Sequence, residues 1–206
     1  MNIKKLASLS VMIAVSVVLT ALVHFPIFPA VPFLEYDPAD IPVIIAGFAF
    51  GPSAGVLITF AAAIIQGLTV SAQSGIYGIL MHIIATSFLV VTSSVIYKVN
   101  KTKKGAVIAL LCGISAMTLS MIPANLYITP YFMGVERSVV KGLLIYMIAF
   151  NLIKAGLNSA ITFVIYKKIS GILHRLDDRK EDHEPGYVDK YQTENRKQAE
   201  KKNEIY

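Results

Sequence analysis

The chain lacks charge over most of its length. Of its 206 residues, only 16% are Asp, Glu, Lys or Arg, whereas a soluble domain carries about 25%. The deficit is confined to residues 1–166, which hold nine basic and four acidic residues, while residues 167–206 hold ten and nine. Apolar runs of about 20 residues in the first part are long enough to cross a bilayer as helices. The composition therefore predicts an integral membrane protein with a polar C-terminal extension.

The chain also lacks the motifs of common catalytic and metal sites. Its one cysteine, Cys112, lies in an apolar run, so it forms neither an internal disulfide nor a metal cluster and is interpreted as a small core residue. There is no G-x-x-x-x-G-K-[ST] loop for ATP, no H-E-x-x-H and no G-x-S-x-G. The histidines are scattered, and His82, inside a span, is interpreted as a packed or substrate-near polar group rather than a catalytic one. We expect no enzymatic activity, no metal and no cofactor.

The net charge of +6 does not indicate a nucleic-acid partner, because of where the basic residues lie. Six of the nine in the apolar part stand beside the ends of hydrophobic segments: Lys4, Lys5, Lys98, Lys101, Lys103 and Lys104. This distribution is typical of the cytoplasmic ends of membrane helices. The partner that it predicts is the lipid bilayer.

Six apolar segments are candidate membrane spans. They are Leu6–Phe25, Ile41–Phe50, Ser53–Val70, Gly75–Tyr97, Gly105–Met133 and Gly142–Tyr166. The first is longer than the apolar region of a signal peptide and is expected to be retained. The second has only ten residues, too few to span alone. If it crosses nevertheless, all basic clusters share one face of the membrane and all four acids lie on the other.

The charge pattern therefore favours an all-α bundle of six transmembrane helices with both termini cytoplasmic. In this arrangement the proline-rich segment Pro26–Pro42, which has no Lys or Arg, lies mostly outside. The membrane domain is predicted to cover residues 1–173. Residues 174–206 form a polar cytoplasmic tail that contains too few apolar residues to fold and is expected to be disordered.

A lysine stands at the middle of the last predicted span. Lys154 there costs about 2.5–3.5 kcal/mol on insertion scales, so a functional role is the default interpretation. Asn151 and Asn158 lie three before and four after it, on the same helix face. This polar stripe must face the bundle interior, as a binding pocket or as structural hydrogen bonding between helices.

The fifth span holds a second polar pair, Asn125 and Tyr127, between Pro123 and Pro130. Proline removes a backbone hydrogen bond, and freed carbonyls at membrane depth persist only where protein or a cavity satisfies them. A simple kink packed by its neighbours is the alternative. Together the two polar features predict a cavity for a mostly apolar molecule with several hydrogen-bonding groups.

Four segments in this order resemble a known family: DPADIP from Asp37, FAFGPSAG from Phe48, NLYITPYFMG from Asn125 and FNLIKAG from Phe150. They are similar to the riboflavin-binding S component of energy-coupling factor (ECF) transporters, over about residues 4–173. The Asn-x-x-Lys pair is the most specific element, whereas the first two segments also occur in S components for other vitamins. One departure is that some members carry a Lys-Asn pair in the third span, where this chain has Ala62 and Ala63 with Gln66 nearby.

The resemblance implies six helices with cytoplasmic termini and a set of site residues. Asn125, Asn151 and Lys154 would hydrogen-bond the flavin, and the loop from Pro26 to Asp40 would cover it. Tyr127 and Asp40 complete the predicted substrate-binding set. The implied function is a non-enzymatic riboflavin-binding subunit of a prokaryotic plasma-membrane transporter, whose ECF module supplies a transmembrane scaffold subunit and two ATPase subunits. An S component for a different vitamin, a membrane-embedded enzyme and a stand-alone carrier remain alternatives.

Small residues on the first span suggest where that module docks. Ala7, Ser10, Ala14 and Ala21 form a stripe on one helix face, and close contact between membrane helices depends on small residues. Ser10 and Ala14 form the tightest pair and resemble the docking motif of S components. Ordinary packing within the chain's own bundle is the alternative.

Overall fold

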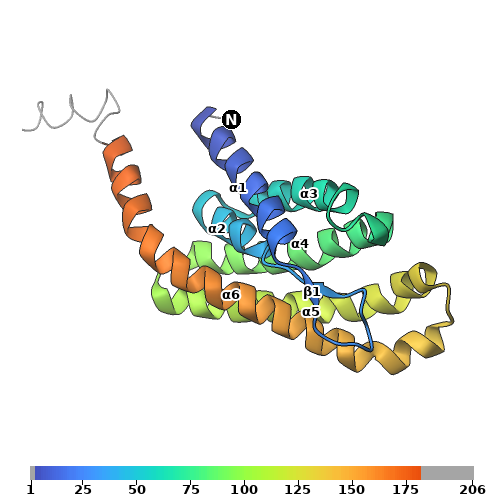
Figure 1. Ribbon diagram of the computed structural model, residues 1–206. Helices are drawn as coiled ribbons and strands as arrows, with labels where there is room; N and C mark the ends of the chain where they lie inside the picture. Colours follow the sequence, from blue (N-terminus) through green and yellow to red (C-terminus); the bar gives the residue numbers. More distant parts are fainter. Residues whose placement is uncertain (1–2, 182–206) are drawn as a thin grey trace, which may run out of the picture. The chain divides into compact units, whose positions relative to one another are not determined.

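The structure is a computed structural model that describes the backbone of residues 3–181 and the side chains of residues 3–166 and 168. Within this range each of the six predicted apolar segments forms one α-helix (Figure 1). The helices are α1 (Ile3–Leu22), α2 (Asp40–Phe50), α3 (Pro52–Leu68), α4 (Gly75–Val99), α5 (Lys103–Met133) and α6 (Arg137–Glu181), with a short 3-10 helix, η1 (Ala72–Ser74), before α4.

The boundary between α2 and α3 is a single residue. Gly51 has a φ of 92°, in the left-handed region that glycine enters without steric cost. Pro52 follows as the first residue of α3, where its missing N–H removes no helical hydrogen bond. The Gly-Pro pair thus ends one helix and begins the next.

Length and hydropathy separate the helices into two groups. Four segments are long and apolar enough to cross a membrane: Ile3–Leu22, Ala72–Val99, Lys103–Met133 and Arg137–Tyr166. The helices α2 and α3 are apolar but shorter, and the 11 residues of α2 extend only about 16 Å. Residues 40–48 of α2 are all buried, so this helix lies inside the bundle. The described part of the chain is thus predominantly helical and has the apolar helices of a membrane protein. The count of six spans stays a prediction.

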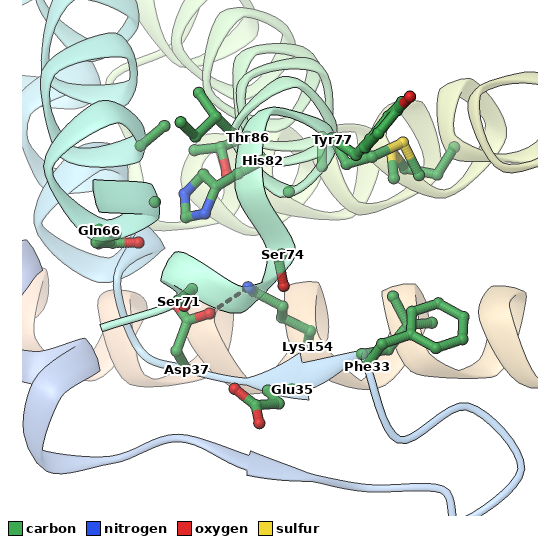
Figure 2. A pocket seen from close by; sticks show the side chains of 18 of the residues that line it. Phe33, Glu35, Asp37, Gln66, Ser71, Ser74, Tyr77, His82, Thr86 and Lys154 are labelled. Atoms are coloured by element: carbon green, nitrogen blue, oxygen red, sulfur yellow. Dashed lines mark hydrogen bonds and ion pairs between the residues drawn. The ribbon is translucent and has the colours of Figure 1, made fainter. Parts of the chain in front are cut away.

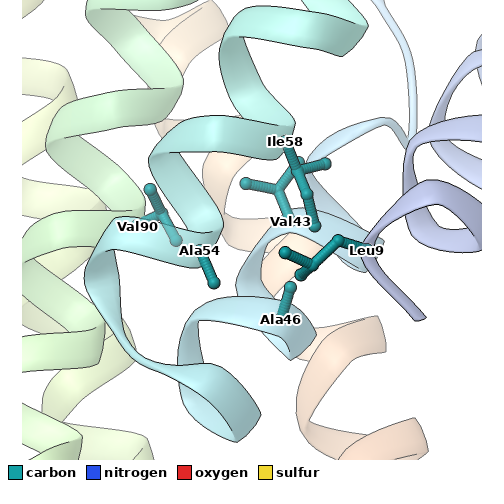
Figure 3. Packing of buried hydrophobic residues seen from close by; sticks show 6 residues of the cluster. All are labelled: Leu9, Val43, Ala46, Ala54, Ile58 and Val90. Carbon is teal, nitrogen blue, oxygen red and sulfur yellow. The ribbon is translucent and has the colours of Figure 1, made fainter. Parts of the chain in front are cut away.

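An apolar core holds the first four helices together. We call it the core cluster: Leu9, Val43, Ala46, Ala54, Ile58 and Val90 (Figure 3). At its edge, Gly47 of α2 and Gly55 of α3 lie against each other and against the Val90 side chain. The contact is so close that an added Cβ on either glycine would collide with Val90. Absence of a side chain at these two positions lets α2, α3 and α4 approach closely.

The connection between α1 and α2 folds over the bundle instead of extending away from it. Phe25–Pro26 (β1) and Glu35–Tyr36 (β2) form a short antiparallel ladder, which the sequence analysis did not predict. Val31, at the tip of this connection, packs with Val140 and Met147 of α6 in a second apolar cluster. The connection is therefore anchored on α6, far from it in sequence.

The described chain divides into two units within α6. The first unit ends at Ile165 and contains all the residues discussed below. Of the second unit, the structure describes residues 166–181, which continue α6 as helix. Residues 174–181 are thus helical although the sequence analysis assigned them to a disordered tail. The rest of that predicted tail, 182–206, lies outside the described residues.

Candidate substrate-binding site

The lysine at mid-span in α6 has a counterion from the α1–α2 connection. The Lys154 ammonium lies 2.6 Å from Asp37 Oδ2, and both side chains are close to nine-tenths buried (Figure 2). A buried charge with a hydrogen-bonded partner avoids most of the penalty of leaving water. The pair also joins α6 to a residue 117 positions earlier in the chain.

Asn158, one turn further along α6, reinforces this connection. Its side-chain amide donates to the Asp37 backbone carbonyl at 3.0 Å and to Asp40 Oδ2 at 3.0 Å. Its carbonyl oxygen accepts a hydrogen bond from the Tyr36 hydroxyl, also at 3.0 Å. Lys154 and Asn158 therefore lie on one face of α6, as the sequence predicted, and bind the segment 36–40. We call the group Tyr36, Asp37, Lys154 and Asn158 the loop–α6 seam.

Asp40 links the seam to α4. It is the first residue of α2, where a carboxylate is favoured by the helix dipole. Its Oδ1 accepts a 2.6 Å hydrogen bond from Thr86, and Oδ2 accepts the one from Asn158. His82 Nε2 lies 4.0 Å from the same Oδ1, beyond hydrogen-bonding distance.

The surroundings of Asp37 favour its ionised form. Burial raises the pKa of its carboxyl, but the attraction of the Lys154 ammonium and hydrogen bonds from Lys154 and the Ala39 backbone N–H outweigh burial and hold the pKa below its usual value. A lowered pKa of Asp37 favours a carboxylate beside the Lys154 ammonium, so that the two charges offset each other.

A cavity of about 150 Å³ lies beside the seam, far larger than the space that one water molecule needs. One part of its wall is aromatic: Phe132 has Phe33 edge-on at 5.5 Å and Tyr77 at 6.1 Å between ring centroids. Other parts are polar. The polar lining residues include Asp37, Gln66, His82, Thr86, Thr129, Asn151 and Lys154. An aromatic wall with a few placed polar groups is typical of a small-molecule site.

Of the predicted site residues, the structure places Asn151 and Lys154 on this wall. Asn151 uses its Nδ2 to donate to the Met147 carbonyl of its own helix at 2.7 Å. Asp40 is fully buried and does not line the cavity, but it accepts a hydrogen bond from the lining residue Thr86. The structure thus brings these three predicted residues together.

The two predicted residues of α5 lie elsewhere. Asn125 is buried and bonded within its helix, donating to the Met121 carbonyl and accepting from Thr129, itself a lining residue. Tyr127 is 59% exposed and lies under the Arg137 guanidinium, whose carbon is 4.7 Å from the ring centroid. Neither side chain lines the cavity. Their role in binding stays a prediction.

Asp37 and Gln66 line the cavity, but the sequence pattern does not identify either as a binding residue. A signal for Asp37 was present, because a lysine at mid-span needs a partner and the acids of the apolar part are few. Nothing in the local pattern distinguished Asp37 from Glu35 or Asp40. Gln66 stands out in the sequence only as the polar group nearest to Ala62 and Ala63 in the third span.

The small-residue stripe of α1 faces away from the bundle. Ala7, Ser10, Ala14 and Ala21 are all exposed, whereas Leu9, Ser16 and Thr20 are buried. Ser16 donates to the Ala39 carbonyl at 2.9 Å, which fixes the inner face of α1 on the connection before α2. Within the described residues, the stripe is therefore not covered by the chain's own bundle.

The fold, the buried polar seam and the cavity define a membrane-embedded binding subunit, and comparison with known proteins identifies its class. The family described as "ECF transporter, substrate-specific component" matches residues 4–166, so the chain belongs to this family. The family is that of a transporter component, which confirms the prediction of a non-enzymatic transport subunit.

Among individual proteins, the chain is similar to riboflavin transporters. It is 28% identical to the riboflavin transporter FmnP of Bacillus subtilis, over 82% of this chain and 93% of the relative. It is 25% identical to the riboflavin transporter RibU of Staphylococcus aureus, over 84% and 94% of the two chains. A solved structure, described as the S component of a bacterial ECF transporter, matches with a TM-score of 0.73 and 27% identity, covering 82% of this chain and 97% of that chain.

Proposed function

We propose that this chain binds riboflavin from outside the cell and passes it to a partner ATPase complex in a prokaryotic plasma membrane. The observation that carries the proposal is the cavity, which combines an aromatic wall with hydrogen-bonding side chains from α6. Riboflavin is a planar aromatic ring system with a hydroxylated arm, so it needs both kinds of wall. The names of the similar proteins agree with this choice.

In the proposed site, Lys154 and Asn151 hydrogen-bond the flavin, and Asp40 holds the seam in place through Asn158. Asn151 Oδ1 is available as an acceptor, because the hydrogen bond to Met147 uses only the amide nitrogen. Asn125 and Tyr127 remain predicted binding residues. Asn125 would act through Thr129, which it contacts.

The proposed topology has six spans with both termini cytoplasmic. The buried position of α2 supports this topology. Because α2 is enclosed by its neighbours and does not face lipid, it can be shorter than a helix that spans the bilayer alone. The proposed partners are a transmembrane scaffold subunit and two ATPase subunits, docked on the exposed α1 stripe around Ser10 and Ala14. Single cysteines at Ala30 and Asn100, with Cys112 replaced, test the topology. Reagent added to intact cells should label position 30 and not position 100.

The absorption spectrum of the purified protein tests the substrate. A copurifying yellow ligand with flavin bands, or quenching of flavin fluorescence when riboflavin is added, is the expected result. A colourless protein that leaves flavin fluorescence unchanged would reject riboflavin and favour an S component for another vitamin. Uptake that persists in cells without the partner ATPases would instead identify a stand-alone carrier.

A further inference from the structure

Two residues that line the cavity, Gln66 and His82, each hold a buried side-chain nitrogen with no hydrogen-bond partner. Seven buried side-chain atoms in the described part of the chain lack one, and five of these are hydroxyl oxygens: those of Ser87, Ser94, Thr118, Ser159 and Thr162. A helical hydroxyl can rotate to donate to the carbonyl one turn earlier. The other two atoms are Nε2 of Gln66 and Nε2 of His82. Both of these residues line the cavity, and none of the five hydroxyl residues does.

These two residues lie apart from the aromatic wall. Figure 2 shows Gln66 and His82 toward one end of the pocket, with Tyr77 and Phe33 toward the other. Tyr77 and His82 belong to the same helix, about 7.5 Å apart along its axis. Among the labelled residues, Gln66 of α3 and His82 of α4 thus lie toward one end, which we call the polar end, with Lys154 and Asp37 along one side.

No group in the described part of the chain forms a hydrogen bond with Gln66 Nε2 or His82 Nε2. The carboxylate oxygen closest to His82 Nε2 is Asp40 Oδ1, at 4.0 Å, and it already accepts from Thr86. Gln66 is 3% exposed, so its amide nitrogen cannot be satisfied by bulk water. A buried polar group without a partner is costly. A ligand in the cavity would supply the missing partner once the side chain turns toward it.

The chemistry of the pair indicates which part of a ligand it suits. A carboxamide and an imidazole each offer both donor and acceptor atoms, as do hydroxyl groups. Their two side chains come from different helices, so they can bond successive hydroxyls along a flexible arm. A flat ring system is better placed against Phe33, Tyr77 and Phe132.

We propose that Gln66 and His82 bind the hydroxyl-bearing arm of the ligand and make the site selective for it. The inference rests on the proposed function, because it assigns the two ends of one cavity to the two parts of a flavin. Both Nε2 atoms are enclosed in the structure, so each side chain rotates toward the arm on binding, a change common at binding sites.

Titration with two flavins tests this assignment. Riboflavin carries the hydroxylated arm, and lumiflavin has the same ring system with a methyl group instead. Wild-type protein should bind riboflavin more tightly than lumiflavin. Gln66→Met and His82→Phe should each weaken riboflavin binding about tenfold and change lumiflavin binding by less than about twofold. Thr162→Val, which removes an unpartnered hydroxyl away from the cavity, should change neither.

Retained lumiflavin binding shows that a variant is folded. Equal losses for both flavins, or no loss for riboflavin in either folded variant, would overturn the assignment. The wild-type comparison needs no variant, since equal affinities for the two flavins would also overturn it. Wild-type protein that binds neither flavin would instead reject the proposed function itself.

Discussion

Two regions of the first unit are held together by different interactions. In the core cluster, apolar side chains of α1–α4 pack where Gly47 and Gly55 allow the helices to approach. In the loop–α6 seam, an ion pair and hydrogen bonds join Asp37 to Lys154 and Asn158. Close packing is tolerant of which apolar residue is used but not of added volume. Hydrogen bonds depend instead on the identity and direction of their polar groups, so the two regions should respond differently to substitution.

Breaking the ion pair should have the largest effect on stability. Asp37→Ala leaves the Lys154 ammonium buried without a partner, and we expect a loss of about 3–5 kcal/mol. The double variant Asp37→Ala/Lys154→Met should recover much of this loss, because it leaves no unpaired charge. Thermal unfolding in detergent measures both effects.

Glu35→Ala is the matched control, since Glu35 is an acid of the same connection with no ion pair in the described residues. It should be nearly neutral. If Asp37→Ala were no more destabilising than Glu35→Ala, the seam would not depend on the charge pair.

Adding volume beside the core cluster should lower the free energy of unfolding by less, and it should leave flavin binding unchanged. A Cβ at Gly55 would collide with Val90, whose branched side chain has little freedom to move away. We expect Gly55→Ala to destabilise by about 1–3 kcal/mol while the flavin affinity of the folded protein is retained. Denaturation curves and flavin titration of the same preparation measure the two quantities.

Gly156→Ala on α6 is the matched change, because nothing lies within 4 Å of the added Cβ. It should be neutral or stabilising by up to about 1 kcal/mol, as expected for alanine in a helix. Equal stabilities for the two variants would mean that α2, α3 and α4 do not depend on close approach.

A change on the exposed stripe of α1 should leave the isolated protein almost unaffected. Ala14 is exposed and lies on the opposite side of α1 from Leu9 and Ser16. Ala14→Trp should therefore keep riboflavin binding but abolish uptake and copurification with the ATPase complex. Loss of binding and folding together would show that Ala14 packs within its own bundle, and the docking surface would lie elsewhere.

The helices could be predicted from the sequence because their signals are local. Apolar runs and the Gly51-Pro52 break gave segment boundaries within a few residues of α2, α3 and α5. The polar face of Asn151, Lys154 and Asn158 followed from helix periodicity alone. The short β ladder had no such signal, since two residues per strand are too few to show an alternating pattern.

The site was predicted only in part, because its contacts are distant in sequence. No local pattern pairs Lys154 with an aspartate 117 residues earlier. Asn125 and Tyr127 are predicted as one polar pair from their closeness in sequence. Residues two apart on an α-helix, however, do not face the same way. In the structure Asn125 is buried and Tyr127 is exposed.

Riboflavin titration of the wild-type protein beside Asn151→Ala and Lys154→Ala tests the central claim most directly. Both residues line the cavity, so each variant should lose about 1–3 kcal/mol of binding free energy by leaving a flavin atom unpaired. Ser115→Ala removes an exposed hydroxyl bonded only within α5 and should leave the dissociation constant unchanged. Unchanged dissociation constants in both α6 variants would show that the flavin does not bind in this cavity.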